Sequence, residues 1–429
     1  MSRSVKPPMR VEQSLRLLPA VSELASLRAL ILMSSRAQQR ESWTVDRYST
    51  VGKRLVEPAE LRARLPAALR QASEHLAKLW RAAIDALEAE QRNDFPKAVR
   101  SLLRAGCHEE EAGRFAEART WFAHALGIAE ELRERGPEIE ALRHLGDTEN
   151  TLGYLERAGR HFQRSFALAE AELEQPSIAL ACLGLGTVAA ARLQWVGAES
   201  WVNRGVPHTG GDRRLAGSLS LALGEIARDS GSSQLAQQRL ESALDSFTDA
   251  GDTHGAVRTW RARGLLAARD GQTAEALASY TQALQQLNGH GNASLEIMLR
   301  MSRSELFLQA GRPPDAEDEL RRGEELAIAN QLPYSLARLY VELGKLHGLQ
   351  RDEYGFVFFE KALELCGGPE QAPGLTADVC LAYARFRRGF GQIQDARTYF
   401  ETARNVHEEL GEHQAVERID AEMALLPAA

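Results

Sequence analysis

The chain has 429 residues, of which 44% are hydrophobic and 6% aromatic, and it carries a formal net charge of −7. This composition excludes a disordered chain, and the acidic balance argues against a protein that coats nucleic acid. The four cysteines form no C-x-x-C pair, which favours reduced thiols and a cytoplasmic location. The apolar run from Leu15 to Met33 is interrupted by charges and a proline, so we expect neither a membrane span nor a secretory signal.

The first 96 residues show no clear repeat. Residues 1–10 are basic and contain Pro7-Pro8, so we expect a disordered tail. Residues 11–96 are expected to form a divergent N-terminal helical region, and the sequence leaves open whether it is a cap, an extra repeat or a docking module. Residues 1–60 hold ten Lys plus Arg against six Asp plus Glu. This local surplus of positive charge is compatible with an acidic partner or with an ordinary solvated cap.

A four-point pattern organises the chain after that region. A small residue lies in one helix, an Ala follows about twelve residues later in the next, a large apolar residue comes four further on, and a second small residue three after it. The first-helix positions are Gly106, Gly146, Gly186, Gly224, Gly264, Ser304, Gly344 and Ala384. Their spacing is 40 residues at every step except one of 38, and a fixed period in this range predicts a helical solenoid.

The residue types in the pattern have physical roles. A small side chain lets two helices approach closely, and the large apolar residue fills the neighbouring gap. Glycine recurs where the two helices of a copy join, and it suits the left-handed conformation after a helix end. Leu193 and Arg351 replace it in the third and seventh copies, which leaves open a different construction of those two turns.

Two segments, GRFAEARTWFAHAL and GQTAEALASYTQAL, resemble the tetratricopeptide repeat. The period is longer than the usual 34 residues and is similar to the subclass of kinesin light chain-like, LGN-like and MalT-like repeat regions. The resemblance implies an all-α fold, a right-handed α-solenoid of helix-turn-helix repeats. About eight repeats would fill residues 97–410, with a capping helix and tail in residues 411–429.

The sequence gives no pattern for catalysis. His407 and His413 are six residues apart, which does not place them on one helical face as a zinc-protease pattern requires. Gly344-Lys345 is not followed by Ser or Thr, so it is no phosphate-binding loop. We therefore predict no enzyme, no metal site and no cofactor.

The resemblance implies that first helices line a concave surface. The inner stripe should lie six and three residues before each small residue and one and four after it, because these offsets share one face. The candidate partner-binding residues are Arg143, Asp147, Asn150, Glu225, Arg228, Arg258, Arg261, Arg269, Met298, Met301, Glu305, Arg385 and Arg388. Arg suits carboxylates and Met adapts to varied surfaces, so the partner should carry acidic and apolar anchors. In the alternative, the Arg side chains pair with Glu of neighbouring helices and the Met side chains fill the core.

The sequence as a whole favours a non-catalytic scaffold or adaptor that binds another protein or peptide segment in the concave groove. The alternative is a regulatory sensor, in which a peptide or small ligand controls an effector protein. Arg outnumbers Lys by 46 to 6, which suggests a bacterial origin. The partner, the pathway, the oligomeric state and the choice between concave and convex face stay open.

Overall fold

The computed structural model describes residues 74–287, 292–330, 332–368 and 372–427. The predicted tail of residues 1–10 and most of the divergent region 11–96 lie outside these described residues. The described part consists of helices and contains no β-strand. It forms two compact units, one ending at Leu145 and the other running from Gly146 to Ala429, and each is considered by itself.

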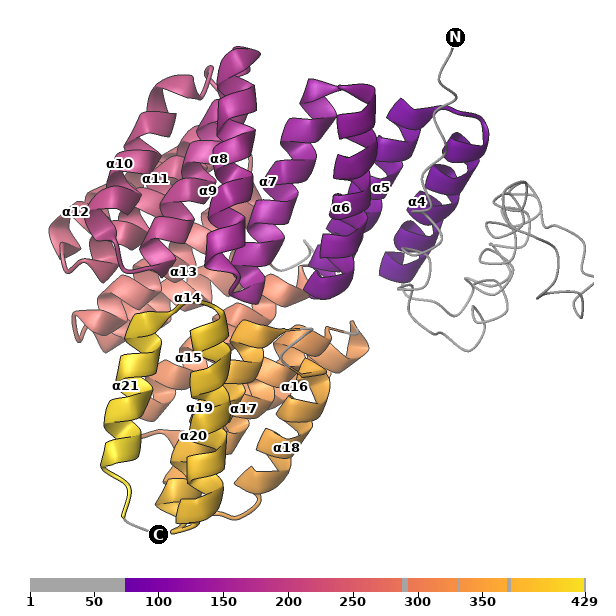
Figure 1. The fold of residues 1–429 in the computed structure, drawn as a ribbon. Helices are drawn as coiled ribbons and strands as arrows, with labels where there is room; N and C mark the ends of the chain where they lie inside the picture. The colour runs from indigo at the N-terminus through magenta and orange to yellow at the C-terminus, as the bar shows by residue number, and fades with distance from the viewer. Residues whose placement is uncertain (1–73, 288–291, 331, 369–371, 428–429) are drawn as a thin grey trace, which may run out of the picture. The chain divides into compact units, whose positions relative to one another are not determined.

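The helices pair in chain order as the period predicts (Figure 1). The first helices are α5 (Phe95–Glu111), α7 (Arg135–Leu152), α9 (Gln175–Ala191), α11 (Arg213–Asp229), α13 (Thr253–Arg269), α15 (Ala293–Gln309), α17 (Pro333–Leu349) and α19 (Pro373–Gly389). The second helices are α6 (Phe115–Leu132), α8 (Leu155–Ala171), α10 (Trp195–Gly205), α12 (Ser233–Asp249), α14 (Thr273–Leu287), α16 (Pro313–Ala329), α18 (Gly355–Cys366) and α20 (Ile393–Glu409). Helix α4 (Glu74–Gln91) precedes these pairs and α21 (His413–Ala424) follows them. The first helices begin 40 residues apart except for the 38-residue step from α9 to α11, so the all-α solenoid is confirmed.

The small first-helix residues lie directly beneath large residues of the second helix. A Cβ atom added to Gly264 would lie 2.3 Å from Cε1 of Tyr280, and one added to Gly106 would lie 2.3 Å from Cε1 of Phe122. Both rings are almost completely buried. Glycine therefore permits the close approach of the two helices, and the ring above it fills the core of the repeat.

Of the two turns that lack glycine, one is built like the others and one is not. Leu193 has φ of 59° and Arg351 has φ of 55°, both in the left-handed region that Gly113 and Gly271 occupy at the equivalent turns. After Leu193 the second helix begins two residues later, as it does after the glycines, so a different construction is absent there. After Arg351 the helix α18 begins only four residues later, and the N–H groups of its first two residues donate to carbonyls three residues back, so this turn is built differently. Both residues accept the unfavourable left-handed backbone conformation.

The third repeat has a shortened second helix. Helix α10 covers only 11 residues, and a short 3₁₀ helix, η3 (Val206–His208), follows it. Pro207 lies in the first turn of η3, and Gly210 and Gly211 adopt positive φ. Proline cannot donate the backbone hydrogen bond that would continue α10, and the two glycines turn the chain toward α11. This explains the step of 38 residues.

Contacts within the second unit also join segments far apart in sequence. Tyr154, at the start of α8, packs against a cluster of Ala377, Val406 and Leu410 from α19 and α20. A Cβ added to Gly153 would lie 3.2 Å from Cα of Gly374. At the end of the unit, Ile419 of α21 and the following Leu426 pack with Phe400 of α20 in another cluster, so α21 covers the last helical pair.

Candidate ligand-binding hollow

A hollow of about 760 Å³, here called the inner hollow, lies in the second unit and is formed mainly by first helices. It is lined by Arg261 and Leu265 of α13, by Met298, Met301, Ser302, Glu305 and Leu308 of α15, by Arg338, Glu342, Lys345, Gly348 and Leu349 of α17, by Arg351 and Phe359, and by Ala382, Arg385, Phe386, Gly389 and Phe390 at α19. Four successive repeats therefore contribute to one recess. Its volume is within the range of sites that hold small ligands or short peptide segments.

Five of the thirteen predicted residues line the inner hollow. They are Arg261, Met298, Met301, Glu305 and Arg385. In the sixth repeat all four stripe positions, which are Met298, Met301, Glu305 and Leu308, face this recess. Arg269 and Glu305 also line a smaller hollow of about 170 Å³ beside Tyr280. The offset rule therefore identified the lining of α15 completely and that of the neighbouring first helices in part.

The prediction missed the contribution of the seventh repeat. Arg338, Lys345 and Gly348 of α17 line the inner hollow, and they lie six residues before, one after and four after Gly344. The same offsets that located the residues of α15 would have found them. Phe386 and Phe390 also line the recess but occupy no stripe position, so the sequence offered no signal for them.

The remaining predicted residues lie outside the inner hollow. In the first unit, Nη2 of Arg143 lies 2.7 Å from Nε2 of His144. In the second unit Asp147 is exposed and Asn150 is half-buried with no hydrogen-bond partner for Oδ1 among the described residues. On α13 and its neighbour α11, Arg258 is exposed and Glu225 is half-buried.

The alternative interpretation, in which the Arg side chains pair with Glu of neighbouring helices, is confirmed for Arg385 and Arg388. Arg388 lies 3.7 Å from Glu422 of α21, whereas Arg228 pairs with Asp229 on its own helix, its Nε lying 2.7 Å from Oδ1. Arg385 donates two hydrogen bonds to the same Glu422 carboxylate, at 3.0 and 2.5 Å. These guanidinium groups already have carboxylate partners, which leaves Arg261 as the predicted arginine of the hollow without one among the described residues.

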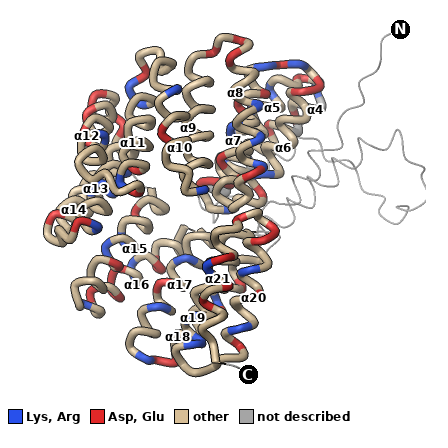
Figure 2. Tube along the Cα trace, turned by 60° about the vertical axis from the view of Figure 1, so that its left-hand side comes forward, with Lys and Arg blue, Asp and Glu red and all other residues tan. Residues whose placement is uncertain are grey.

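Arg261 has an unusual environment for a cationic side chain. It is half-buried, and its Nε donates a hydrogen bond of 3.1 Å to Oγ of Ser302 on α15. Burial lowers the pKa of Arg261, and the nearby charges of Arg338 and Arg228 lower it further, against the opposing effect of Glu225. No carboxylate of the described residues forms an ion pair with it. Figure 2 marks the basic and acidic residues along the helices of this region.

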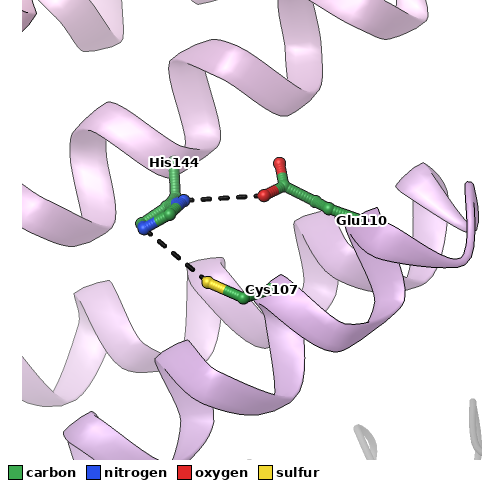
Figure 3. A group of neighbouring side chains, drawn as sticks. All are labelled: Cys107, Glu110 and His144. Atoms are coloured by element: carbon green, nitrogen blue, oxygen red, sulfur yellow. Dashed lines mark hydrogen bonds and ion pairs between the residues drawn. The ribbon is translucent and has the colours of Figure 1, made fainter. Parts of the chain in front are cut away.

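A second group of reactive side chains lies in the first unit (Figure 3). Sγ of Cys107 is 3.8 Å from Nε2 of His144, and Oε2 of Glu110 is 3.6 Å from Nδ1 of the same ring. The three ligand atoms lie within 4.8 Å of one another. No sequence pattern predicted this pair, because Cys107 and His144 are 37 residues apart and meet through the packing of α5 against α7.

The charges around this group argue against a reactive thiol. Burial, together with the Glu110 carboxylate, raises the pKa of Cys107 to about 12, so the sulfur is a protonated thiol at neutral pH. Arg143 lies against Nε2 of His144, and a guanidinium can only donate. The proton of the imidazole is then on Nδ1, facing Glu110. We interpret the group as a hydrogen-bonded packing contact, and the absence of a metal site stays a prediction.

Among the described helices, none is long and apolar enough to cross a bilayer. No protein-family model and no curated protein matches the chain. Solved structures do: a Rap protein complexed with Competence and Sporulation Factor is similar over 91% of this chain and 98% of its own, with 13% identity and a TM-score of 0.55.

Two further similar structures have lower TM-scores. A tetratricopeptide repeat protein from Parabacteroides merdae has 13% identity and a TM-score of 0.41, covering 70% of this chain and 97% of its own. Aspartyl phosphate phosphatase F from Bacillus subtilis has 10% identity and a TM-score of 0.48, covering 95% and 96%. At these identities the likeness concerns the fold alone, which is a solenoid of tetratricopeptide-like helical repeats.

Proposed function

We propose that the chain is a non-catalytic scaffold or adaptor that binds a segment of another protein, or a peptide, in the inner hollow. The observation that carries this proposal is the lining of one recess of about 760 Å³ by first helices of four successive repeats. Its walls combine apolar side chains with a few charged ones, as is typical of ligand sites. A solenoid offers such a continuous surface because each repeat contacts only its neighbours.

Two further points support the same proposal. The Rap protein with the similar fold was solved in complex with Competence and Sporulation Factor, a bound partner in a solenoid of this kind. The 40-residue step between first helices fits the long-period subclass of tetratricopeptide repeats, and we propose that the chain belongs there. We further propose that this adaptor is cytoplasmic and bacterial, because the cysteines lack C-x-x-C pairs and Arg greatly outnumbers Lys.

The test uses the purified full chain and pools of dye-labelled hexapeptides, each pool with one fixed residue at one position. Binding is measured by fluorescence polarisation for the unchanged protein and for Leu308→Arg, which places a long charged side chain in the inner hollow. The matched control is Val196→Arg on α10, where the side chain is 85% exposed. We expect the best pools to bind Leu308→Arg at least about ten-fold more weakly than they bind the unchanged protein. Their affinity for Val196→Arg should equal that for the unchanged protein. The proposal fails if no pool binds or if both variants behave alike.

The regulatory sensor is a second candidate, favoured by the packing of Tyr154 against Ala377 and Leu410. The hollow-lining helices run from α13 to α19, and Tyr154 joins the start of α8 to α19 and the end of α20. A ligand that changes the angle between repeats would therefore strain this contact. Binding and contact are then thermodynamically coupled. A sensor therefore requires that Tyr154→Ala change the affinity for the selected peptide by about three-fold or more. An unchanged affinity contradicts the sensor and leaves the adaptor.

A further inference from the structure

We propose that the inner hollow selects an acidic peptide, with one carboxylate against Arg261 and Arg338 and a large apolar side chain about four residues away against Phe386 and Phe390. This inference rests on the proposed function and names the chemistry of the partner. Three kinds of observation carry it. They are the unbalanced charges of the hollow, the hydrogen bonds that hold Arg261, and the order of side chains along the parallel first helices.

The hollow has more positive than negative groups available to a ligand. Its cations are Arg261, Arg338, Lys345, Arg351 and Arg385, and its carboxylates are Glu305 and Glu342. Lys345 pairs with Glu342 at 2.8 Å, and Arg385 is held by Glu422 of α21. Within the described chain this leaves three lining cations without an ion pair, against the lining carboxylate of Glu305. The carboxylates of Glu225 and Asp378 interact electrostatically with Arg261 and Arg338 from outside the lining. An acidic ligand would balance the lining cations.

Arg261 is positioned to accept a carboxylate. Its Nε donates to Oγ of Ser302 at 3.1 Å, and that hydroxyl in turn donates to the carbonyl oxygen of Met298 at 3.0 Å. These bonds fix the guanidinium against α15. Neither Nη atom has a hydrogen-bond partner among the described residues, so both NH₂ groups of the guanidinium remain for a ligand. A carboxylate matches such a fork, and its bond is stronger where water is partly excluded.

Burial supports this choice over the other unpaired cations. Arg261 is half-buried, whereas Arg338 and Arg351 are exposed. Water solvates an exposed guanidinium well, but a partly buried one that forms no ion pair is costly. Glu225, whose charge raises the pKa of Arg261, forms no ion pair with it. Arg338 is near enough to lower the pKa of Arg261, so the two charges repel each other. A carboxylate between them relieves that repulsion, while Arg351 remains solvated at the rim.

The order of residues along the helices gives the ligand a direction. Arg261 and Arg338 lie three and six residues before the small residues Gly264 and Gly344. Phe386 and Phe390 lie two and six residues after Ala384. First helices run parallel in a stack of hairpins, so the cationic and aromatic residues are offset along the helix axes by five to twelve residues. At 1.5 Å per residue this offset is roughly 8 to 18 Å, or about two to five residues of extended peptide.

The aromatic end is suited to one large apolar side chain. The ring centroids of Phe386 and Phe390 are 4.8 and 5.4 Å from that of Phe356, and 4.7 Å from each other. Leu308 and Leu349 complete this end of the lining, and Leu349 is 72% exposed. An exposed leucine beside aromatic rings loses unfavourable contact with water when a ligand covers it.

The experiment compares the affinities of the same hexapeptide pools according to which residue type is fixed. We expect pools with a fixed Asp or Glu to bind at least about ten-fold more tightly than those with Asn or Gln at the same position. A fixed Leu, Met or Phe should be preferred three to five positions away. If pools bind without any preference for Asp or Glu, the acidic partner is refuted while the hollow remains a binding site. If none binds, the proposed function itself fails.

The residue assignment is tested with a matched pair on α13. Arg261→Gln removes the charge inside the hollow, and Arg258→Gln removes an exposed charge one turn earlier, outside it. For the best acidic peptide we expect about ten-fold weaker binding to Arg261→Gln and none of this loss for Arg258→Gln. The peptide with Gln in place of its Glu should bind Arg261→Gln as it binds the unchanged protein.

A folding defect in Arg261→Gln does not obscure the outcome, because Arg338→Gln changes an exposed residue and provides a second measurement. We expect it to weaken the acidic peptide about three-fold and to leave the Gln peptide unaffected. Equal effects of Arg338→Gln on both peptides, or equal effects of Arg258→Gln and Arg261→Gln, would overturn the assignment of the carboxylate to this end.

Discussion

At the scale of single residues, the first-helix glycines set how closely two helices approach. A Cβ on Gly264 would lie 2.3 Å from the Tyr280 ring, while a Cβ on Gly159 of α8 would have its nearest neighbour, Val188, at 3.8 Å. Alanine normally stabilises a helix relative to glycine by up to about 1 kcal/mol. At Gly264 overpacking should cost about 1–3 kcal/mol and so outweigh that gain.

We therefore expect Gly264→Ala to lower the midpoint of urea unfolding and Gly159→Ala to raise it slightly. Circular dichroism at 222 nm during a urea titration gives both values. If the two variants had the same midpoint, the ring of Tyr280 would have room to move aside, and the small residue would have no packing role in that repeat.

Leu193 and Arg351 have left-handed backbone conformations that cost an ordinary residue about 1–2 kcal/mol. Leu193→Gly relieves this strain but also removes a side chain that is only 39% exposed. The control is Leu235→Gly in α12, where the exposure is a similar 37% but the backbone is helical. Both changes lose similar buried surface, so Leu235→Gly should destabilise by about 1–2 kcal/mol more than Leu193→Gly. Urea titrations measure both values, and equal destabilisation by the two variants contradicts the strain.

Glu109 of α5 gives the first unit a defined pH dependence. Burial raises the pKa of Glu109 to about 7, although Arg114 acts in the opposite direction. The folded state then binds the proton of Glu109 more tightly than the unfolded chain does. The stability that Glu109 contributes is therefore fully present below about pH 4.5 and is lost as the pH rises through about 7. The variant Glu109→Gln should therefore become more stable than the unchanged protein as the pH rises.

Thermal unfolding at pH 5, 6.5 and 8 checks this expectation, with the exposed Glu156→Gln on α8 as control. The difference in midpoint between Glu109→Gln and the unchanged protein should grow across the series, and that of Glu156→Gln should stay constant. A difference that shrinks with rising pH would show that the ion pair with Arg114 outweighs burial.

At the scale of helices, α21 is connected to the inner hollow through one carboxylate. Glu422 accepts hydrogen bonds from Arg385, and these bonds lower its pKa. The variant Glu422→Gln would release Arg385 as a further unpaired cation in the lining. Because the pair is partly exposed, the effect is modest: we expect two- to three-fold tighter binding of the best acidic peptide. Fluorescence polarisation measures it, and weaker binding would indicate that Arg385 needs Glu422 to hold its position.

The helices themselves could be predicted from the sequence, since each pair repeats the same small and large residues 40 positions on. The lining of the hollow could be predicted in part. The offsets of the inner stripe identify lining residues only where the helix faces the recess, as in α15. Arg258 shows the limit: it has a stripe offset, but α13 lines the hollow only from Arg261 onward. How far each helix lies along its neighbours is set by packing, which the pattern does not contain.

Other features depend on contacts that no period reveals. Phe386 and Phe390 reach the recess through an aromatic cluster with Phe356 that belongs to the last two repeats alone. Cys107 and His144 meet because α5 and α7 are neighbouring first helices, and neither residue recurs in other copies. A repeat pattern identifies what copies share, whereas these residues belong to single copies.

At the scale of the whole molecule, the second unit combines local stacking with one distant contact. Its core forms repeat by repeat, as in the cluster of Tyr280 with Val257 and Leu299. In addition, Tyr154 near its beginning packs against Leu410 near its end. Nearest-neighbour stacking alone would leave the angle between repeats free to vary. The distant contact restricts it, which should keep the hollow between α13 and α19 at a defined width.

The most direct test is photo-cross-linking of the best acidic peptide, carrying a benzophenone side chain at its apolar position, to the unchanged full chain. Mass spectrometry then locates the attached residues. Binding in the inner hollow predicts cross-links to α15, α17 and α19, concentrated near Leu308, Leu349 and Phe390, and their loss in the presence of unlabelled peptide. Specific cross-links concentrated instead on the second helices α14, α16 and α18 would place the partner on the opposite face and contradict the account.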